Sequence, residues 1–120
     1  MDSFNFKTPV FVYQGAYQGP NLCLFGTLHG DELNGIEIIR QLLNELELDS
    51  LYGTVIGVPI VNMDGFRRDC RYMTSRKDLN RAFPGSPEGH IAERLAHYFY
   101  TGIASHCDYI VDIHTGSLHR

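Results

Sequence analysis

The sequence lacks the features that would place it in a membrane or secreted class. Its start, MDSFNFKTPV, has neither the basic stretch nor the apolar stretch of a signal peptide. Its longest apolar run, TVIGVPIV, is far shorter than the roughly 20 residues that a membrane-spanning helix needs. No repeat or low-complexity segment is present. We therefore expect a soluble, cytoplasmic globular protein that does not bind membranes.

The sequence also lacks an excess of positive charge. Ten Lys and Arg residues stand against 14 Asp and Glu residues, so the formal net charge is -4. A protein that binds DNA or RNA normally presents a basic face to the phosphates, and this composition does not favour one. We therefore expect no nucleic-acid partner.

Cysteine is scarce as well. The three cysteines are an odd number and include no CxxC pair. Such cysteines are more typical of reduced thiols than of a disulfide framework. Cys23 and Cys107 lie in or beside apolar runs, so we expect both to be small core residues.

The sequence does contain strands and helices in alternation. With 120 residues, it is long enough for one core and one domain. Short apolar stretches predict four strands, at 10–13, 22–28, 54–62 and 108–113. Between them lie two stretches with helical spacing, and this order predicts an α/β fold with a sheet covered by helices.

Capping signals predict where the two helices begin. Asp31 is expected to be the N-cap or a first-turn acid of the first helix. The second helix is expected to begin with Ser86 as N-cap and Pro87 in its first turn, and to end at Gly102.

A long polar segment, residues 63–86, separates the third strand from the second helix. Loops of this length are uncommon in compact domains and are usually functional or disordered. The six basic residues in it favour function, although a solvated basic connector is the alternative. Asn80 and Arg81 could grip a carboxylate, because the Arg guanidinium offers a planar fork. Arg71 could stabilise a developing oxyanion.

A histidine follows two of the expected strands. His29 comes directly after the second strand with Glu32 three positions on, and His114 follows the last strand. Ligands of open α/β sheets bind at the carboxyl ends of strands, so these three side chains can meet. Two imidazoles and one carboxylate are typical of a catalytic zinc site that keeps one position open.

Ordinary explanations exist for each of these residues alone. A single strand-end histidine is more often hydrogen-bonded than metal-bound, and His and Glu three apart occur by chance in many chains. The third residue, in DIHTG, is what favours a metal site. Asp112 lies on the same sheet face as His114, where it either orients that ring or is an ordinary hydrogen-bonding aspartate.

Together these residues make the chain resemble the succinylglutamate desuccinylase/aspartoacylase family of zinc carboxypeptidase-like hydrolases. The resemblance rests on HGDELNG, VPIVNMDGFRR, RYMTSRKDLNRAFPGS and DIHTG, which occur in the family's order over residues 22–118. It implies a three-layer α/β/α sandwich around a mixed sheet. It also implies a zinc-dependent amidohydrolase that cleaves the amide bond of an N-acyl amino acid or a similar small acylated acid.

The resemblance also assigns roles to single residues. It implies His29, Glu32 and His114 as the ligands of one zinc ion, with Asn80 and Arg81 as the clamp for the substrate's carboxylate. It implies Arg71 as an arginine that either polarises the carbonyl or binds the substrate, and Arg76 is its rival because the spacing before DLNR varies among relatives.

One part of the family pattern has no counterpart here. The family's general-base glutamate lies well downstream of DIHTG, and the chain ends six residues after His114. We therefore expect residues 1–120 to be a partial, N-terminal catalytic domain that binds zinc with little or no turnover. The apolar stretch DYIVDI is unsuited to an exposed edge, so either further chain or a second copy is expected to cover it.

Two other functions remain open from the sequence. The Asn–Arg clamp would equally suit a zinc carboxypeptidase that acts on the C-terminal carboxylate of peptides. The missing base would suit a non-catalytic metal-binding fragment that is stable as an oligomer.

Overall fold

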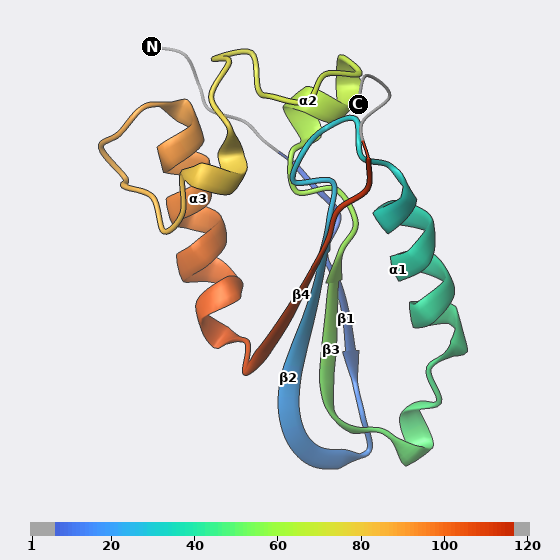
Figure 1. The fold of residues 1–120 in the computed structure, drawn as a ribbon. Helices are drawn as coiled ribbons and strands as arrows, with labels where there is room; N and C mark the ends of the chain where they lie inside the picture. The colour runs from blue at the N-terminus through green and yellow to red at the C-terminus, as the bar shows by residue number, and fades with distance from the viewer. Residues whose placement is uncertain (1–6, 117–120) are drawn as a thin grey trace.

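The fold is a four-stranded sheet with a helix packed on each face. A computed structural model describes residues 7–116 (Figure 1). The strands are β1 (Phe11–Gln14), β2 (Tyr17–Gly26), β3 (Tyr52–Val58) and β4 (Tyr109–Ile113). The helices are α1 (Asn34–Glu45), α2 (Met63–Arg67) and α3 (Ile91–Gly102), with 3-10 turns η1 (Leu48–Ser50), η2 (Leu79–Arg81) and η3 (Ala104–His106).

The sheet is mixed, in the order β1-β3-β2-β4. β2 pairs in parallel with both β3 and β4, and β1 pairs antiparallel with β3. The parallel strands all end at the same edge, which is the upper edge in Figure 1. This arrangement confirms the α/β class and the mixed sheet that the family resemblance implied.

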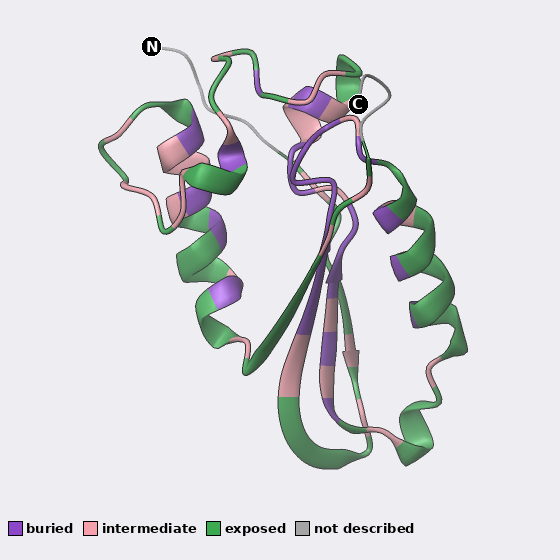
Figure 2. Ribbon diagram, in the orientation of Figure 1, coloured by how far each residue is buried: buried purple, intermediate pink, exposed green. Residues whose placement is uncertain are grey.

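Two apolar cores lie on opposite faces of the sheet, because successive strand residues point to opposite sides. On β2, Cys23 and Phe25 face α3, while Leu24 faces α1. On α1, Ile39 and Leu43 recur at helical spacing and are buried against that second face. Figure 2 shows both helices burying only the side that faces the sheet.

The last strand differs from the other parallel strands in its exposure. Within residues 7–116, β4 pairs with β2 alone, and Tyr109, Ile110 and Val111 are all exposed (Figure 2). This apolar free edge is the feature that the composition of DYIVDI predicted to need a cover.

Both predicted helix starts are wrong. α1 begins three residues after Asp31, and its N-cap is Leu33. α3 begins at Ile91 with His90 as N-cap, where His90 and Glu93 form a capping box, so Ser86 and Pro87 belong to the preceding turn. Two good local capping signals therefore did not mark the helix starts. Gly102 is the last residue of α3, as predicted.

The long polar segment is less irregular than its composition suggested. It contains α2 and η2, and Asn62 and Asp78 cap these short elements with their side chains. The segment is an ordered covering of the sheet edge where the parallel strands end (Figure 1).

Cys23 and Cys107 are joined by a disulfide, which contradicts the prediction of reduced thiols. The two Cα atoms are 5.9 Å apart, within the range that a disulfide requires. Their sequence separation of 84 hid this proximity, which arises because β4 pairs beside β2. Cys70 is the free cysteine of the described chain.

In the part of the chain that the structure describes, no helix has both the length and the apolar character to cross a membrane.

Candidate metal centre

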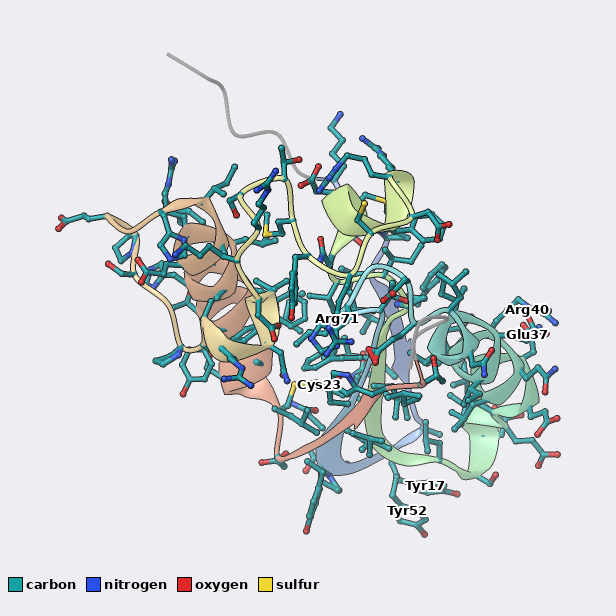
Figure 3. The ribbon with its side chains drawn as sticks, turned by 45° about the horizontal axis from the view of Figure 1, so that its top comes forward. Tyr17, Cys23, Glu37, Arg40, Tyr52 and Arg71 are labelled. Carbon is teal, nitrogen blue, oxygen red and sulfur yellow. A yellow bond between two sulfur atoms is a disulfide. The ribbon has the colours of Figure 1, made fainter. Side chains whose placement is uncertain are left out.

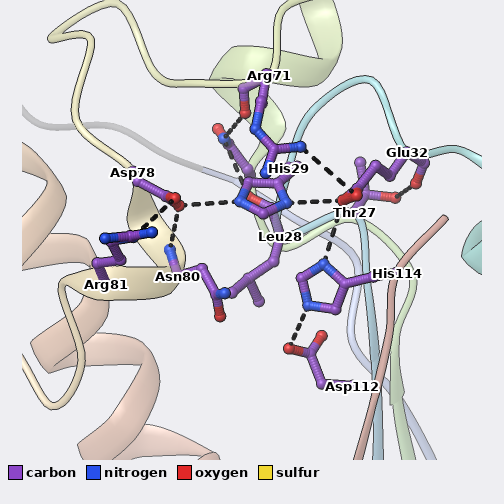
Figure 4. A network of polar contacts seen from close by, with 11 residues as sticks. Thr27, Leu28, His29, Glu32, Arg71, Asp78, Asn80, Arg81, Asp112 and His114 are labelled. Atoms are coloured by element: carbon purple, nitrogen blue, oxygen red, sulfur yellow. Dashed lines mark hydrogen bonds and ion pairs between the residues drawn. The ribbon is translucent and has the colours of Figure 1, made fainter. Parts of the chain in front are cut away.

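The ends of two neighbouring strands bring three separate side chains together. His29 and Glu32 lie in the turn that joins β2 to α1, and His114 follows β4 directly. Because Gly26 pairs with Ile113 at the end of the parallel ladder, both strands deliver these residues to one edge. Figure 4 shows the three side chains converging there.

The three side chains approach one another through atoms that can bind a metal. Nδ1 of His29 lies 2.7 Å from Oε2 of Glu32, and Nδ1 of His114 lies 3.2 Å from the same oxygen. One ligand atom from each residue falls within 4.8 Å of the others. His29 and Glu32 are buried, and His114 is exposed, so the cluster is open on one side.

Each imidazole is held from behind by an aspartate. Nε2 of His29 lies 3.0 Å from Oδ1 of Asp78, and Nε2 of His114 lies 2.7 Å from Oδ2 of Asp112. A proton on Nε2 donates to the aspartate and leaves the lone pair of Nδ1 directed toward the cluster. Metal-binding histidines almost always have such a partner on their second nitrogen.

The charge around His114 favours its protonated form in the absence of a metal. Partial burial opposes protonation, but the hydrogen bond to Asp112 and the charges of Asp112 and Glu32 outweigh it. The pKa of His114 is therefore raised above its usual value. A bound cation would take the place of a proton that the carboxylates already attract.

The turn that carries His29 is built on an unusual backbone. Thr27 is fully buried and has a φ of 55°, a region that β-branched residues rarely occupy. Its hydroxyl donates a 2.9 Å hydrogen bond to the carbonyl of Pro59, and its own carbonyl accepts from the amide of Asn62 at 3.0 Å. These bonds to the segment after β3 hold the chain in the sharp turn that aims His29 and Glu32 at the same point.

Arg71 lies beside the cluster, whereas Arg76 does not contribute to it. Nη1 of Arg71 forms an ion pair with Oε1 of Glu32 at 3.7 Å. Burial disfavours its charge, but a hydrogen bond involving Tyr72 and the charge of Glu32 raise the pKa of Arg71. Arg76 lies in an exposed turn with a φ of 61°. Of the two rival arginines, Arg71 is the one at the site, in the centre of Figure 3.

Asn80 and Arg81 lie at the rim of the site. Both are exposed, and the Arg81 side chain is 88% accessible, with its Nε 3.7 Å from Oδ2 of Asp78. Asn80 also lines a cavity of about 270 Å³ that extends along Phe25 and Asp112. Both side chains are therefore accessible to a ligand that approaches from solvent.

Asp78 was not among the site residues that the sequence predicted, although it lies in the DLNR motif. Its contact with His29 joins residues 49 positions apart, and only the fold of η2 over the sheet edge creates it. The available signal was an aspartate two residues before the expected clamp. Asp112 was anticipated, because two positions along a strand return a side chain to the same face.

The residues of this cluster suit a divalent cation. Two imidazole nitrogens and one carboxylate oxygen form a donor set typical of zinc, and the open side of the cluster leaves room for a further ligand. With aspartates behind both histidines, the arrangement goes beyond a chance gathering of polar groups.

Comparison with known proteins shows the family to which this chain belongs. The family model described as the succinylglutamate desuccinylase/aspartoacylase catalytic domain matches residues 18–120. The chain belongs to this family. Its similarity extends to solved members, which include succinylglutamate desuccinylase/aspartoacylase from Rhodobacter sphaeroides, with a TM-score of 0.83 and 36% identity over 92% of this chain and 34% of that one.

Two further members of the family are similar over most of this chain. N-alpha-acetyl-L-2,4-diaminobutyric acid deacetylase of Halomonas elongata is 37% identical over 102 residues, which are 82% of this chain and 29% of the relative. The product-bound ectoine utilization protein EutE (DoeB) from Ruegeria pomeroyi has a TM-score of 0.80 and 34% identity over 91% of this chain and 33% of that one. The chain thus spans about a third of the length of these family members.

A more distant likeness extends to the cell shape determinant Csd4 from Helicobacter pylori. That structure, bound to a tripeptide, has a TM-score of 0.74 at 22% identity. At this identity the likeness shows that the fold is shared.

Proposed function

We propose that this chain forms part of a zinc-dependent hydrolase that removes the acyl group from an N-acyl amino acid. The observation that carries the proposal is the convergence of His29, Glu32 and His114, with ligand atoms within 4.8 Å of one another. The membership of the chain in a deacylase family supports the reaction class. When bound, one zinc ion would polarise the substrate's carbonyl and lower the pKa of a water molecule to about 7.

Arg71 is proposed to stabilise the oxyanion that develops on the attacked carbonyl. Its guanidinium stays charged and lies next to Glu32, which places positive charge beside the metal centre. Its Nε is buried and has no hydrogen-bond partner among the described residues. A fixed donor aimed at developing charge is among the strongest contributions to catalysis.

Asn80 and Arg81 are proposed to bind the substrate's carboxylate. Both are exposed at the rim, and Arg81 has a planar fork that can grip two carboxylate oxygens. The ion pair of Arg81 with Asp78 would have to loosen for this, and an exposed pair of this kind costs little to open.

The general base is proposed to come from outside this chain. The three carboxylates that the described residues bring to the histidines are Glu32, Asp78 and Asp112, and each is hydrogen-bonded to an imidazole. None of these three is therefore placed to take a proton from water. We accordingly propose that residues 1–120 are the N-terminal part of a catalytic domain, and that this part alone binds zinc but turns over little substrate.

Substrate class is the finer part of the proposal. The Halomonas elongata relative is named for an acetylated diamino acid, so N-acetyl amino acids are the first class to test, followed by N-succinyl amino acids. A carboxypeptidase reaction would use the same rim residues. Dipeptides that are blocked at the N-terminus and keep a free C-terminal carboxylate are the substrates that test for it. We propose that the substrate is a small molecule and that the protein is cytoplasmic. The pairing of a second copy of the chain along β4 remains a prediction.

The test is hydrolysis of N-acetyl-aspartate, N-acetyl-diaminobutyrate, N-succinyl-glutamate and a blocked dipeptide, with and without zinc. It should be run on this chain and on a version extended downstream to the length of the relatives. The proposal expects zinc-dependent release of an amino acid by the extended protein. Activity confined to the dipeptide, or no zinc-dependent hydrolysis at all, would overturn it.

A further inference from the structure

Asn62, which lies four residues after the end of β3 and directly before α2, is a buried polar residue with no role in the proposed chemistry. Its side chain is fully buried, and the hydrogen bonds it makes go to main-chain atoms of three different segments. Its Oδ1 accepts from the amide of Gly65 at 2.9 Å, which caps α2. Its Nδ2 donates to the carbonyl of Leu28 at 3.3 Å and approaches the carbonyl of Arg71 at 3.5 Å.

These carbonyls belong to the two segments that make up the site. Leu28 immediately precedes His29, and Arg71 is the arginine beside Glu32. A second bond connects the same segments, because the amide of Gly30 donates to the carbonyl of Arg71 at 3.0 Å. The Asn62 amide thus lies between the turn that carries the metal ligands and the segment that carries the arginine.

The two segments approach so closely that only glycine fits at position 30. A Cβ on Gly30 would lie 2.3 Å from the carbonyl oxygen of Cys70 and 2.3 Å from the carbonyl carbon of Gly65. With the backbones this close, a buried amide that bonds to both sides fixes their relative position. An unpaired buried donor or acceptor would be costly, so the arrangement tolerates little displacement.

We propose that Asn62 is a positioning residue that fixes the main chain of Arg71 against the turn that carries His29. A long arginine side chain samples many rotamers, and an anchored main chain limits where its guanidinium can reach. Asn62 thereby holds the Arg71 guanidinium beside the Glu32 carboxylate. The kinetic consequence rests on the proposed function, while the structural linkage does not.

Asn62→Asp is the sharpest test of the linkage. Aspartate keeps the size and the oxygen that caps α2, but it replaces the Nδ2 donor by an oxygen that faces two carbonyls. Asn62→Ser is the second variant, because its hydroxyl can also cap α2 but cannot reach both carbonyls. Asn44→Asp, on the exposed side of α1, is the matched control.

Amide hydrogen exchange followed by NMR reads the linkage directly in the 120-residue protein. In Asn62→Asp or Asn62→Ser, the Gly30 amide should exchange at least about tenfold faster than in the wild type, while the β2 amides change by less than about threefold. In Asn44→Asp, the Gly30 amide and the β2 amides should all change by less than about threefold. Unchanged protection of Gly30 would overturn the proposal. An equal loss of protection across the whole sheet would overturn it as well, since that would show general destabilisation.

A double-mutant cycle with Arg71→Ala in the extended protein tests the kinetic consequence. Asn62→Asp should lower kcat/KM by about tenfold or more alone, but by less than about twofold when Arg71 is already alanine. Zinc affinity should change by less than about threefold. Equal losses in both backgrounds would contradict action through Arg71. If no hydrolysis is found, the proposed function fails, and hydrogen exchange still decides the role of Asn62.

Discussion

The centres of the His29 and His114 imidazole rings lie 5.1 Å apart, and the Nδ1 atoms of both rings are directed at the same carboxylate oxygen, Oε2 of Glu32. This relationship depends on the parallel pairing of β2 with β4, which ends both strands at the same edge. It also depends on the aspartate behind each ring, which determines the nitrogen that faces the centre (Figure 4).

Removal of the carboxylate behind His114 should weaken zinc binding without unfolding the protein. Asp112 is exposed, and its side chain bonds to His114. Asp112→Ala should reduce zinc affinity by about 10–100-fold, because Nε2 loses the acceptor that orients the ring. Competition with a chromogenic chelator measures the affinity. Glu45→Ala, at the exposed end of α1, is the control, and equal affinities in the two variants would contradict a role for Asp112.

Arg71 and Arg76 should differ sharply when each is replaced by lysine. Lysine keeps the charge but lacks the planar fork. Arg71→Lys in the extended protein should lower kcat by about 10²-fold, since a positioned donor to the oxyanion is lost. Arg76→Lys should change kcat by less than about twofold, because Arg76 lies in an exposed turn. Steady-state kinetics measures kcat for both variants. A larger loss of kcat in Arg76→Lys than in Arg71→Lys would assign the catalytic role to Arg76.

The segment that carries Arg71 should lose stability at neutral pH when Asp64 is neutralised. Partial burial disfavours the Asp64 carboxylate, but hydrogen bonds from the amide and hydroxyl of Thr74, and from Arg68, outweigh it and lower the pKa of Asp64. Because the pKa of Asp64 is lower in the folded protein than its value of 3.8 in the unfolded chain, the ionised carboxylate stabilises the fold at any pH above 3.8. This stabilisation is lost as the pH falls below 3.8 and through the pKa of the folded protein.

Asp64→Asn should therefore lower the free energy of unfolding by about 1 kcal/mol at pH 7, with the difference shrinking below pH 3.8. Urea titration at pH 7 and at a pH below 3.8 measures the free energy of unfolding of both proteins. Asp49→Asn, in η1, is the exposed control. A stability difference that stays constant down to acid pH would rule out the ionised Asp64 carboxylate as its source.

Thiol counting should distinguish the observed pairing from the reduced state that the composition suggested. The unfolded, unreduced protein should show one reactive thiol, from Cys70, and three after reduction. Reduction should also lower the free energy of unfolding by about 2–4 kcal/mol, because the bond closes a long loop. Three thiols before reduction would restore the original prediction.

The sequence was sufficient to predict the α/β class, the strands and the convergence of His29, Glu32 and His114. The strands were predictable because their apolar runs are short and bounded by turn residues. The convergence of the three side chains was predictable because polar residues at strand ends are conspicuous. The Glu37–Arg40 ion pair and the stacked Tyr17 and Tyr52 rings lie on the outer surface (Figure 3).

Long-range contacts were not predictable. The bond from Asp78 to His29, the disulfide of Cys23 with Cys107 and the bonds of Asn62 all join residues that become neighbours only after the sheet has assembled. The helix starts were not predictable from the caps either. Asp31 and Ser86 have capping chemistry, but α1 begins three residues after Asp31 and α3 begins five residues after Ser86.

Metal analysis of the purified 120-residue protein tests the central claim most directly. After dialysis against zinc and then buffer, the protein should retain about one zinc ion per chain. Glu32→Gln and His29→Ala should retain less than about a tenth of that, with folding verified by circular dichroism. A wild-type protein that holds no zinc, or folded variants that hold as much as the wild type, would contradict a metal centre at these residues.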